Sequence, residues 1–313
     1  MNFKFELSDL KFPKLRSPLD TDGALYKISN MKKSLNYFFL SAFVFNYAAA
    51  DSFALQGRVL EVLPEDRSLR LELVESANDS MPAGEIRDFR VGAGDLEIDY
   101  SDRLIKATAV YYGNAWHLER VFPLGGVGVK AMNDVNRQLH TLVASMSRRD
   151  YLKEGEYIPN FAMIDQHGNF LQIRELRGKA FVLNFIFTRC KAAAMCPASM
   201  QRMAKLQEEA RESGLKDVHF VTVTFDPEFD SPGIMRSYGK HYDLEMENYH
   251  LLTAAPEVVD DLLRLFGIVT MEEDGTINHT MATLLIDANG RIAFRKEGSR
   301  WSVSEFLKEI QAL

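Results

Sequence analysis

The chain has 313 residues, of which 46% are hydrophobic and 26% are charged, and its formal net charge is −7. This length allows two domains, and the composition is that of a soluble globular protein that can bury a core. The acidic balance and the absence of a basic stripe in the sequence argue against nucleic acid as a partner.

The first fifty residues contain a pattern typical of an export signal. A lysine pair at 32–33 precedes a mostly apolar stretch at 35–47, and three alanines follow at 48–50. A basic start, a short apolar middle and small residues at the end characterise a secretory signal peptide. We therefore expect a signal peptide over residues 31–50 and a periplasmic, extracytoplasmic location, with residues 1–30 as a non-native or disordered extension. A buried helix or an uncleaved anchor is the alternative.

Residues 51–125 are expected to form a small all-β domain, an OB-like barrel. Apolar and polar residues alternate in LQGRVLEVLPEDRSLRLELVE around a turn at 64–67, and again in RLIKATAVYYGNAWHLERVFP around Gly113-Asn114. Short alternating segments joined by turns predict hairpins, and several of them predict a barrel or a sandwich. Residues 126–154 contain helical spacing and are interpreted as a connecting helix and linker.

From residue 155 to the end of the chain, strand and helix patterns alternate. The continuous apolar runs AFVLNFIF and VHFVTVTF predict strands that are buried on both faces. Further strands are expected on both sides of His167-Gly168-Asn169, at YHLLT, and in a hairpin about Asn289-Gly290. Helices are predicted at 197–212, 231–241, 256–266 and from 302 to the end. This alternation predicts a central mixed sheet covered on both faces, an α/β domain over 155–313.

The chain has two cysteines, Cys190 and Cys196, in the segment FTRCKAAAMCP. Cys190 follows a predicted buried strand and Cys196 precedes a predicted helix, and sites in such sheets favour the carboxyl ends of strands. A helix N-terminus stabilises negative charge, so we expect it to favour the thiolate of Cys196.

Three interpretations of the pair stay open from the residues alone: a structural disulfide, a redox couple, or two arms of a metal site. A bridge over so short a loop would remove little chain entropy, which favours a functional pair. In the redox interpretation Cys190 is the attacking thiol and Cys196 the resolving thiol, although the helix start favours Cys196 as the reactive thiol.

Three separated segments resemble the Sco/SenC family of thioredoxin-like copper proteins. They are GKAFVLNFIFTRCKAAAMCP, VTFDPEFDSP and INHTMATLLIDANGRI, and they occur in the family's order. The resemblance implies a thioredoxin-like domain that binds copper, as Cu(I) or Cu(II), through Cys190, Cys196 and His279. Two soft thiolates with one imidazole suit this metal. The resemblance further implies an exported metallochaperone that helps copper insertion into cytochrome c oxidase, with an oxidase subunit or another copper acceptor as its partner.

The sequence departs from the family pattern in two places. The family spacing is Cys-x3-Cys, but here five residues separate the cysteines, and Asn278 stands where the family has an acidic residue. We expect His279 to lie on a loop before the strand MATLLID, and we assign Asp226 a secondary role. The alternative function is a thiol-disulfide oxidoreductase that uses Cys190 and Cys196 without His279 as a ligand.

The barrel segment in part resembles the CusF-type copper-binding domain, in GRVLEVLPEDRSLRLEL, Met81-Pro82 and WHLERVFP. Only Met81 of that family's metal ligands is in register, so we expect the barrel without its metal site. Met195 and Met200 lie near the cysteines but are interpreted as core residues. Six further histidines have no motif context and are expected to be surface or satisfied residues: His117, His140, His167, His219, His241 and His250.

Overall fold

The computed structural model describes residues 51–125, 128–147, 149–273 and 276–313. The predicted extension and the predicted signal peptide lie outside the described residues. Contacts group residues 49–313 into one compact unit. In the described part of the chain, none of the helices combines the length and apolar character needed to cross a membrane.

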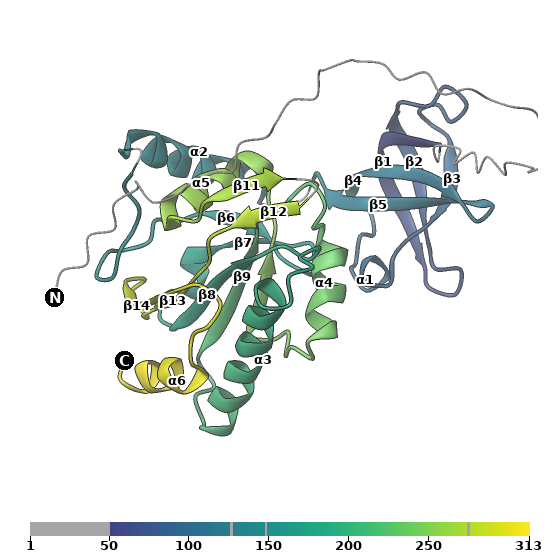
Figure 1. Ribbon diagram of the computed structural model, residues 1–313. Helices are drawn as coiled ribbons and strands as arrows, with labels where there is room; N and C mark the ends of the chain where they lie inside the picture. Colours follow the sequence, from purple (N-terminus) through teal and green to yellow (C-terminus); the bar gives the residue numbers. More distant parts are fainter. Residues whose placement is uncertain (1–50, 126–127, 148, 274–275) are drawn as a thin grey trace, which may run out of the picture. The chain divides into compact units, whose positions relative to one another are not determined.

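Five strands form a closed barrel (Figure 1). The strands are β1 (Ser52–Leu63), β2 (Ser68–Ser76), β3 (Ile86–Arg90), β4 (Leu104–Tyr112) and β5 (Ala115–Pro123). They pair in the order β1-β2-β3-β5-β4, and β1 closes the barrel on β4. The β3–β5 contact is parallel and the other pairings are antiparallel.

The predicted turns connect these strands. Gly113 and Asn114 join β4 to β5 with positive φ values of 56° and 61°, as the favoured two-residue hairpin turn requires. The alternating residues of the strands fill the barrel: Leu55, Val59, Leu69, Leu71, Leu73, Phe89, Ile105, Ala107, Ala109, Leu118 and Val121. A short helix, α1 (Ala93–Leu96), follows β3.

Helix α2 (Val129–Ser145) follows the barrel and is shorter than the predicted connecting segment. The next elements are β6 (Ala162–Ile164), β7 (Phe170–Gln172) and the 3-10 helix η1 (Ile173–Leu176). Strands β6 and β7 pair about the predicted turn, where Gly168 has a φ of 72°.

A five-stranded sheet in the order β10-β9-β8-β13-β14 forms the centre of the C-terminal part. Its strands are β8 (Phe181–Ile186), β9 (His219–Thr224), β10 (Tyr249–Leu252), β13 (Ala282–Ile286) and β14 (Ile292–Glu297). The first three are parallel, and β13 and β14 are antiparallel. Every residue of β8 and β9 is buried, as their continuous apolar runs predict.

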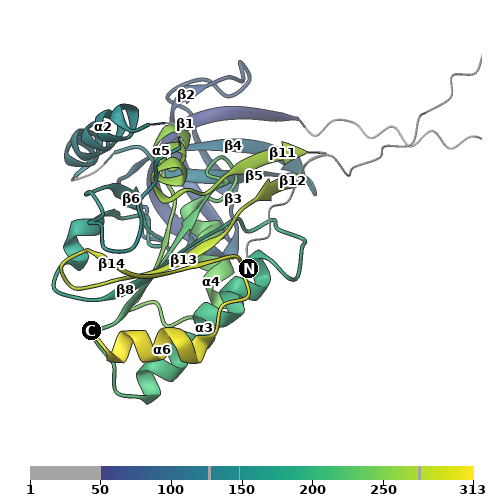
Figure 2. The same cartoon turned by 60° about the vertical axis from the view of Figure 1, so that its left-hand side comes forward.

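Helices cover this sheet on both faces, as predicted. They are α3 (Cys196–Glu212), α4 (Pro232–His241), α5 (Pro256–Phe266) and α6 (Val303–Gln311). Figure 2 shows α3 and α6 together on one face of the sheet, with α2 and α5 on the opposite face. Prolines in the first turns of α3, α4 and α5 start these helices without losing a hydrogen bond. The α/β part is therefore thioredoxin-like.

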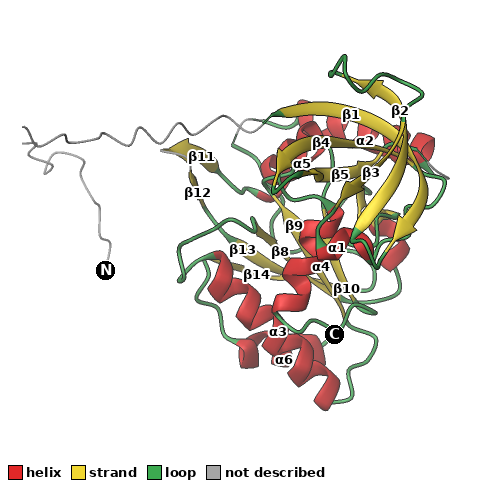
Figure 3. Cartoon of the chain, turned by 90° about the vertical axis from the view of Figure 1, so that its right-hand side faces the viewer, coloured by secondary structure: helices red, strands yellow, loops and turns green. Residues whose placement is uncertain are grey.

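The structure contains a hairpin that the sequence did not predict. Strands β11 (Thr270–Glu273) and β12 (Thr276–His279) pair only with each other, and Figure 3 shows them apart from the five-stranded sheet. The expectation that His279 lies on a loop was wrong, because it is the last residue of β12. Each strand has four residues and few apolar ones, so hydrophobic periodicity contains no signal for them.

Candidate metal centre

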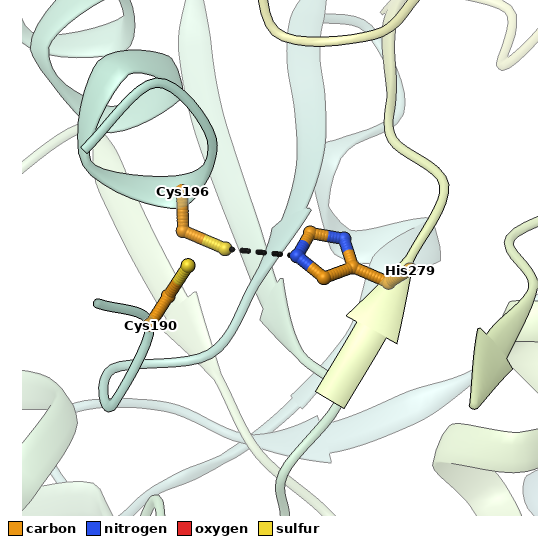
Figure 4. Close-up of side chains that lie close together, drawn as sticks. All are labelled: Cys190, Cys196 and His279. Carbon is orange, nitrogen blue, oxygen red and sulfur yellow. Dashed lines mark hydrogen bonds between the residues drawn. The ribbon is translucent and has the colours of Figure 1, made fainter. Parts of the chain in front are cut away.

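Cys190, Cys196 and His279 lie together in the fold, although 83 positions separate Cys196 from His279 (Figure 4). The two sulfur atoms and a ring nitrogen of the histidine are all within 4.8 Å of one another. Among the described residues, no second group of three or more His, Cys, Asp or Glu side chains is arranged to hold a metal ion. Both cysteines are free thiols.

The two cysteines have different surroundings. Cys190 lies in the loop after β8, where its amide donates to the carbonyl of Phe187 at 3.3 Å, and its side chain is partly exposed. Cys196 is the first residue of α3 and is fully buried. The Ser299 hydroxyl donates to the carbonyl of Ala194 at 2.6 Å and ties the loop between the cysteines to the segment before α6.

The imidazole of His279 is oriented by the backbone next to it. Its Nδ1 lies 3.0 Å from the carbonyl oxygen of Thr280, and its Nε2 lies 3.5 Å from the sulfur of Cys196. Because a carbonyl only accepts hydrogen bonds, Nδ1 carries the proton and the lone pair of Nε2 points at the thiols. A metal-binding histidine is commonly oriented in this way.

Two buried aromatic rings form a wall beside the histidine. The ring centroid of Phe225 lies 4.5 Å from that of His279, and the ring of Phe187 lies at 5.7 Å with its plane at 88°. These residues follow β9 and β8, and their own centroids are 5.1 Å apart. The end of the sheet therefore restricts the rotation of the imidazole.

The two thiols differ in acidity. A hydrogen bond from Cys196 lowers the pKa of Cys190 to about 5, against the opposing effect of burial. The hydrogen bond with Cys190 and burial raise the pKa of Cys196 well above the ordinary thiol value. The expectation that the helix start favours the Cys196 thiolate was wrong, because the hydrogen bond with Cys190 and then burial raise the Cys196 pKa against the field of the helix. Cys190 therefore carries the first negative charge of the pair.

Two acidic residues support the site, and only one of them, Asp226, was singled out from the sequence. Asp226, which was assigned a secondary role, forms an ion pair with Arg189 at 2.6 Å. The carboxylate of Asp230 accepts from the amide of Thr188 at 3.1 Å and also from its hydroxyl. Asp230 lies in the quoted segment VTFDPEFDSP, but no local pattern distinguishes its carboxylate from that of Asp226.

The remaining candidates take structural positions. Met200 is fully buried in the core, and Met81 is buried in the core of the barrel. Met195 precedes α3 as its N-cap and is only half-buried, so the expectation that it is a core residue was wrong. Five of the six other histidines contact a polar or charged side chain or stack on a tyrosine ring, and His241 packs edge-on against Tyr242.

The sequence profile described as SCO1/SenC matches residues 149–313 of this chain. The chain is similar to the SCO2-like protein of Rickettsia felis, with 30% identity over 155 residues that cover 48% of this chain and 74% of that protein. It is 23% identical to the thiol-disulfide oxidoreductase ResA of Bacillus cereus, over 52% of this chain and 82% of that protein. The crystal structure of a SCO1/SenC family lipoprotein from Bacillus anthracis aligns at 27% identity with a TM-score of 0.48, covering 52% of this chain and 99% of that one.

Proposed function

This chain belongs to the SCO1/SenC family, and on that premise we propose that it is a copper metallochaperone that binds its cargo through Cys190, Cys196 and His279. The convergence of two thiols and one oriented imidazole within 4.8 Å carries the proposal. Soft thiolates select Cu(I), and imidazole also suits Cu(II).

The donor atoms fit a metal ion without rearrangement of the fold. With metal–sulfur and metal–nitrogen bonds of about 2.3 and 2.1 Å, as in zinc sites, three donors around one ion lie roughly 3.8–4.0 Å apart. Donors within 4.8 Å of one another therefore need to approach by at most about 1 Å, which side-chain rotation can supply. The partly exposed Cys190 gives an acceptor protein access to the copper.

We assign the acceptor as a cytochrome c oxidase subunit or another protein that takes copper, and the location as periplasmic. The signal pattern at 31–50 supports export. We propose domains at 51–125, 126–154 and 155–313, with the first as an OB-like module that docks or spaces the copper site. The strand order β1-β2-β3-β5-β4 supports the OB-like assignment.

A copper titration of the reduced protein tests the metal site. We expect one Cu(I) per chain in the wild type, measured by competition with a coloured Cu(I) chelator. His279→Ala should weaken copper binding by about tenfold or more, because the site loses its only nitrogen donor. His140→Ala is the matched control, since this exposed histidine pairs with Asp261 instead. Equal affinity of His279→Ala and the wild type, with both folded, would refute the ligand assignment.

A second candidate function is thiol-disulfide exchange, which the adjacent free thiols favour. The Cys190 thiolate would attack a partner disulfide, forming a mixed disulfide and releasing one partner thiolate. Cys196 would then lose its proton and attack the sulfur of Cys190, which releases the reduced partner and leaves an intramolecular disulfide. A disulfide reductase assay with and without copper separates the functions, because this activity requires both cysteines but tolerates His279→Ala.

A further inference from the structure

We propose that Asp230 is the positioning residue of the copper site, and that its buried carboxylate sets the places of both Cys190 and His279. This inference rests on the proposed function, since it concerns how the same site is kept in its binding geometry. Asp230 touches neither the thiols nor the imidazole, so its effect passes through the residues that it holds.

The carboxylate of Asp230 joins three elements of the fold. Asp230 is fully buried and lies just before α4. One oxygen accepts from the amide of Thr188 at 3.1 Å and from the hydroxyl of Thr224 at 2.5 Å, and the other accepts from the hydroxyl of Thr188. The ends of β8 and β9 are therefore tied to the start of α4 by a single side chain.

The first consequence concerns Cys190. Thr188 lies two positions before Cys190, and the Cys190 amide is hydrogen-bonded back to Phe187. Both backbone and side chain of Thr188 are fixed, so the turn that carries the thiol has little freedom to move. Arg189 forms a second tie, to Asp226, but its side chain is 52% exposed, and exposed ion pairs contribute little.

The second consequence concerns His279. Each threonine that Asp230 holds is adjacent in sequence to one ring of the aromatic wall. Phe187 directly precedes Thr188, and Phe225 directly follows Thr224. Both rings contact the imidazole. One carboxylate thus holds the Thr188 amide and the Thr224 hydroxyl, and these two residues adjoin the rings that contact His279.

A carboxylate is the group that this position requires. All three of its hydrogen bonds come from donors, and a carboxylate only accepts. An asparagine keeps these contacts only if the Thr188 hydroxyl reverses to accept from the new NH2 group, and it replaces a charged acceptor by a neutral one, whose hydrogen bonds are weaker. In the described part of the chain, Asp230 has no ion-pair partner that would explain its burial by charge neutralisation.

The test compares copper binding in four variants of the full chain. Asp230→Asn and Thr188→Val each disturb the tie, Thr188→Ser restores the hydroxyl, and Asp165→Asn is the matched control. Asp165 is also buried, but its carboxylate holds the β6–β7 turn at Asn169. The readouts are Cu(I) affinity by chelator competition, the thiolate-to-Cu(II) charge-transfer band, and far-ultraviolet circular dichroism for the fold.

We expect Asp230→Asn and Thr188→Val to lose about 10- to 100-fold in copper affinity and to shift the charge-transfer band. Substitution of residues that orient metal ligands without touching the metal typically has an effect of this size. Thr188→Ser and Asp165→Asn should behave like the wild type. Unchanged copper affinity and an unchanged charge-transfer band in a folded Asp230→Asn would overturn the positioning role. If Asp230→Asn does not fold, the comparison of Thr188→Val with Thr188→Ser takes its place, and equal copper affinity of these two variants would overturn the role. Failure of the wild type itself to bind copper would instead overturn the proposed function.

Discussion

The acidity of Cys190 depends on its neighbour, and replacing that neighbour gives a sharp test of the site. The hydrogen bond from Cys196 is the largest cause of the lowered pKa of Cys190. In Cys196→Ala this donor is lost, so the pKa of Cys190 should rise from about 5 toward the ordinary thiol value of about 8.5. Cys196→Ser retains a hydroxyl donor and should lie between the two.

The magnitude decides which measurement is informative. A thiol with a pKa of about 5 is roughly 99% thiolate at pH 7, whereas one with a pKa of about 8.5 is about 3% thiolate. The nucleophilicity of a thiolate rises by about 0.4–0.5 logarithmic units for each unit by which its pKa rises, which is roughly 40-fold over this interval. The two effects nearly cancel, so the rate of alkylation at pH 7 should change by only about twofold. The midpoint of the pH profile, in contrast, should move by several pH units.

The assay is therefore alkylation of the reduced, copper-free protein by iodoacetamide over a range of pH, with each cysteine identified by peptide mass spectrometry. We expect the rate at Cys190 in the wild type to have its midpoint near pH 5 and to level off by about pH 7, while the buried Cys196 reacts slowly throughout. Circular dichroism at each pH shows that the fold persists. A wild-type midpoint near 8.5, or equal midpoints in the wild type and Cys196→Ala, would show that the hydrogen bond between the thiols does not control Cys190.

Two further predictions concern α1 and its contact with α4. Burial raises the pKa of Asp95 to about 7, so the fold favours its protonated form and the free energy of unfolding should fall as pH rises from about 4 to about 7. Asp95→Asn should remove this dependence on pH and raise the free energy of unfolding at pH 8 by on the order of 4 kcal/mol, since one pKa unit corresponds to about 1.36 kcal/mol. Equal urea midpoints of the variant and the wild type at pH 8 would contradict this. Gly94→Ala should destabilise the fold by about 1–3 kcal/mol, because overpacking carries that cost. The Cβ of an alanine at position 94 would lie 1.9 Å from the carbonyl oxygen of Gly233, whereas in the control Gly125→Ala the new atom has ordinary contacts. Similar melting temperatures of the two variants would refute the argument.

The sequence by itself determined the elements whose signals are local. The apolar runs of β8 and β9 predicted strands buried on both faces, and the structure confirms them because such runs are stable only inside a covered sheet. Gly113-Asn114 and Asn289-Gly290 marked their hairpins through turn chemistry, which depends on adjacent residues alone. The residue types at 190, 196 and 279 indicated a soft metal site through a resemblance of whole motifs.

Only the tertiary structure decided how the site works. It made Cys190 and not Cys196 the acidic thiol, since the hydrogen bond between the two thiols and the burial of Cys196 under α3 both depend on tertiary packing. It placed His279 on a strand whose few apolar residues give no periodic signal. It also gave two buried acids of one short segment different partners, the Arg189 side chain for Asp226 and the Thr188 amide for Asp230, because hydrogen-bond partners depend on contacts between residues far apart in the chain.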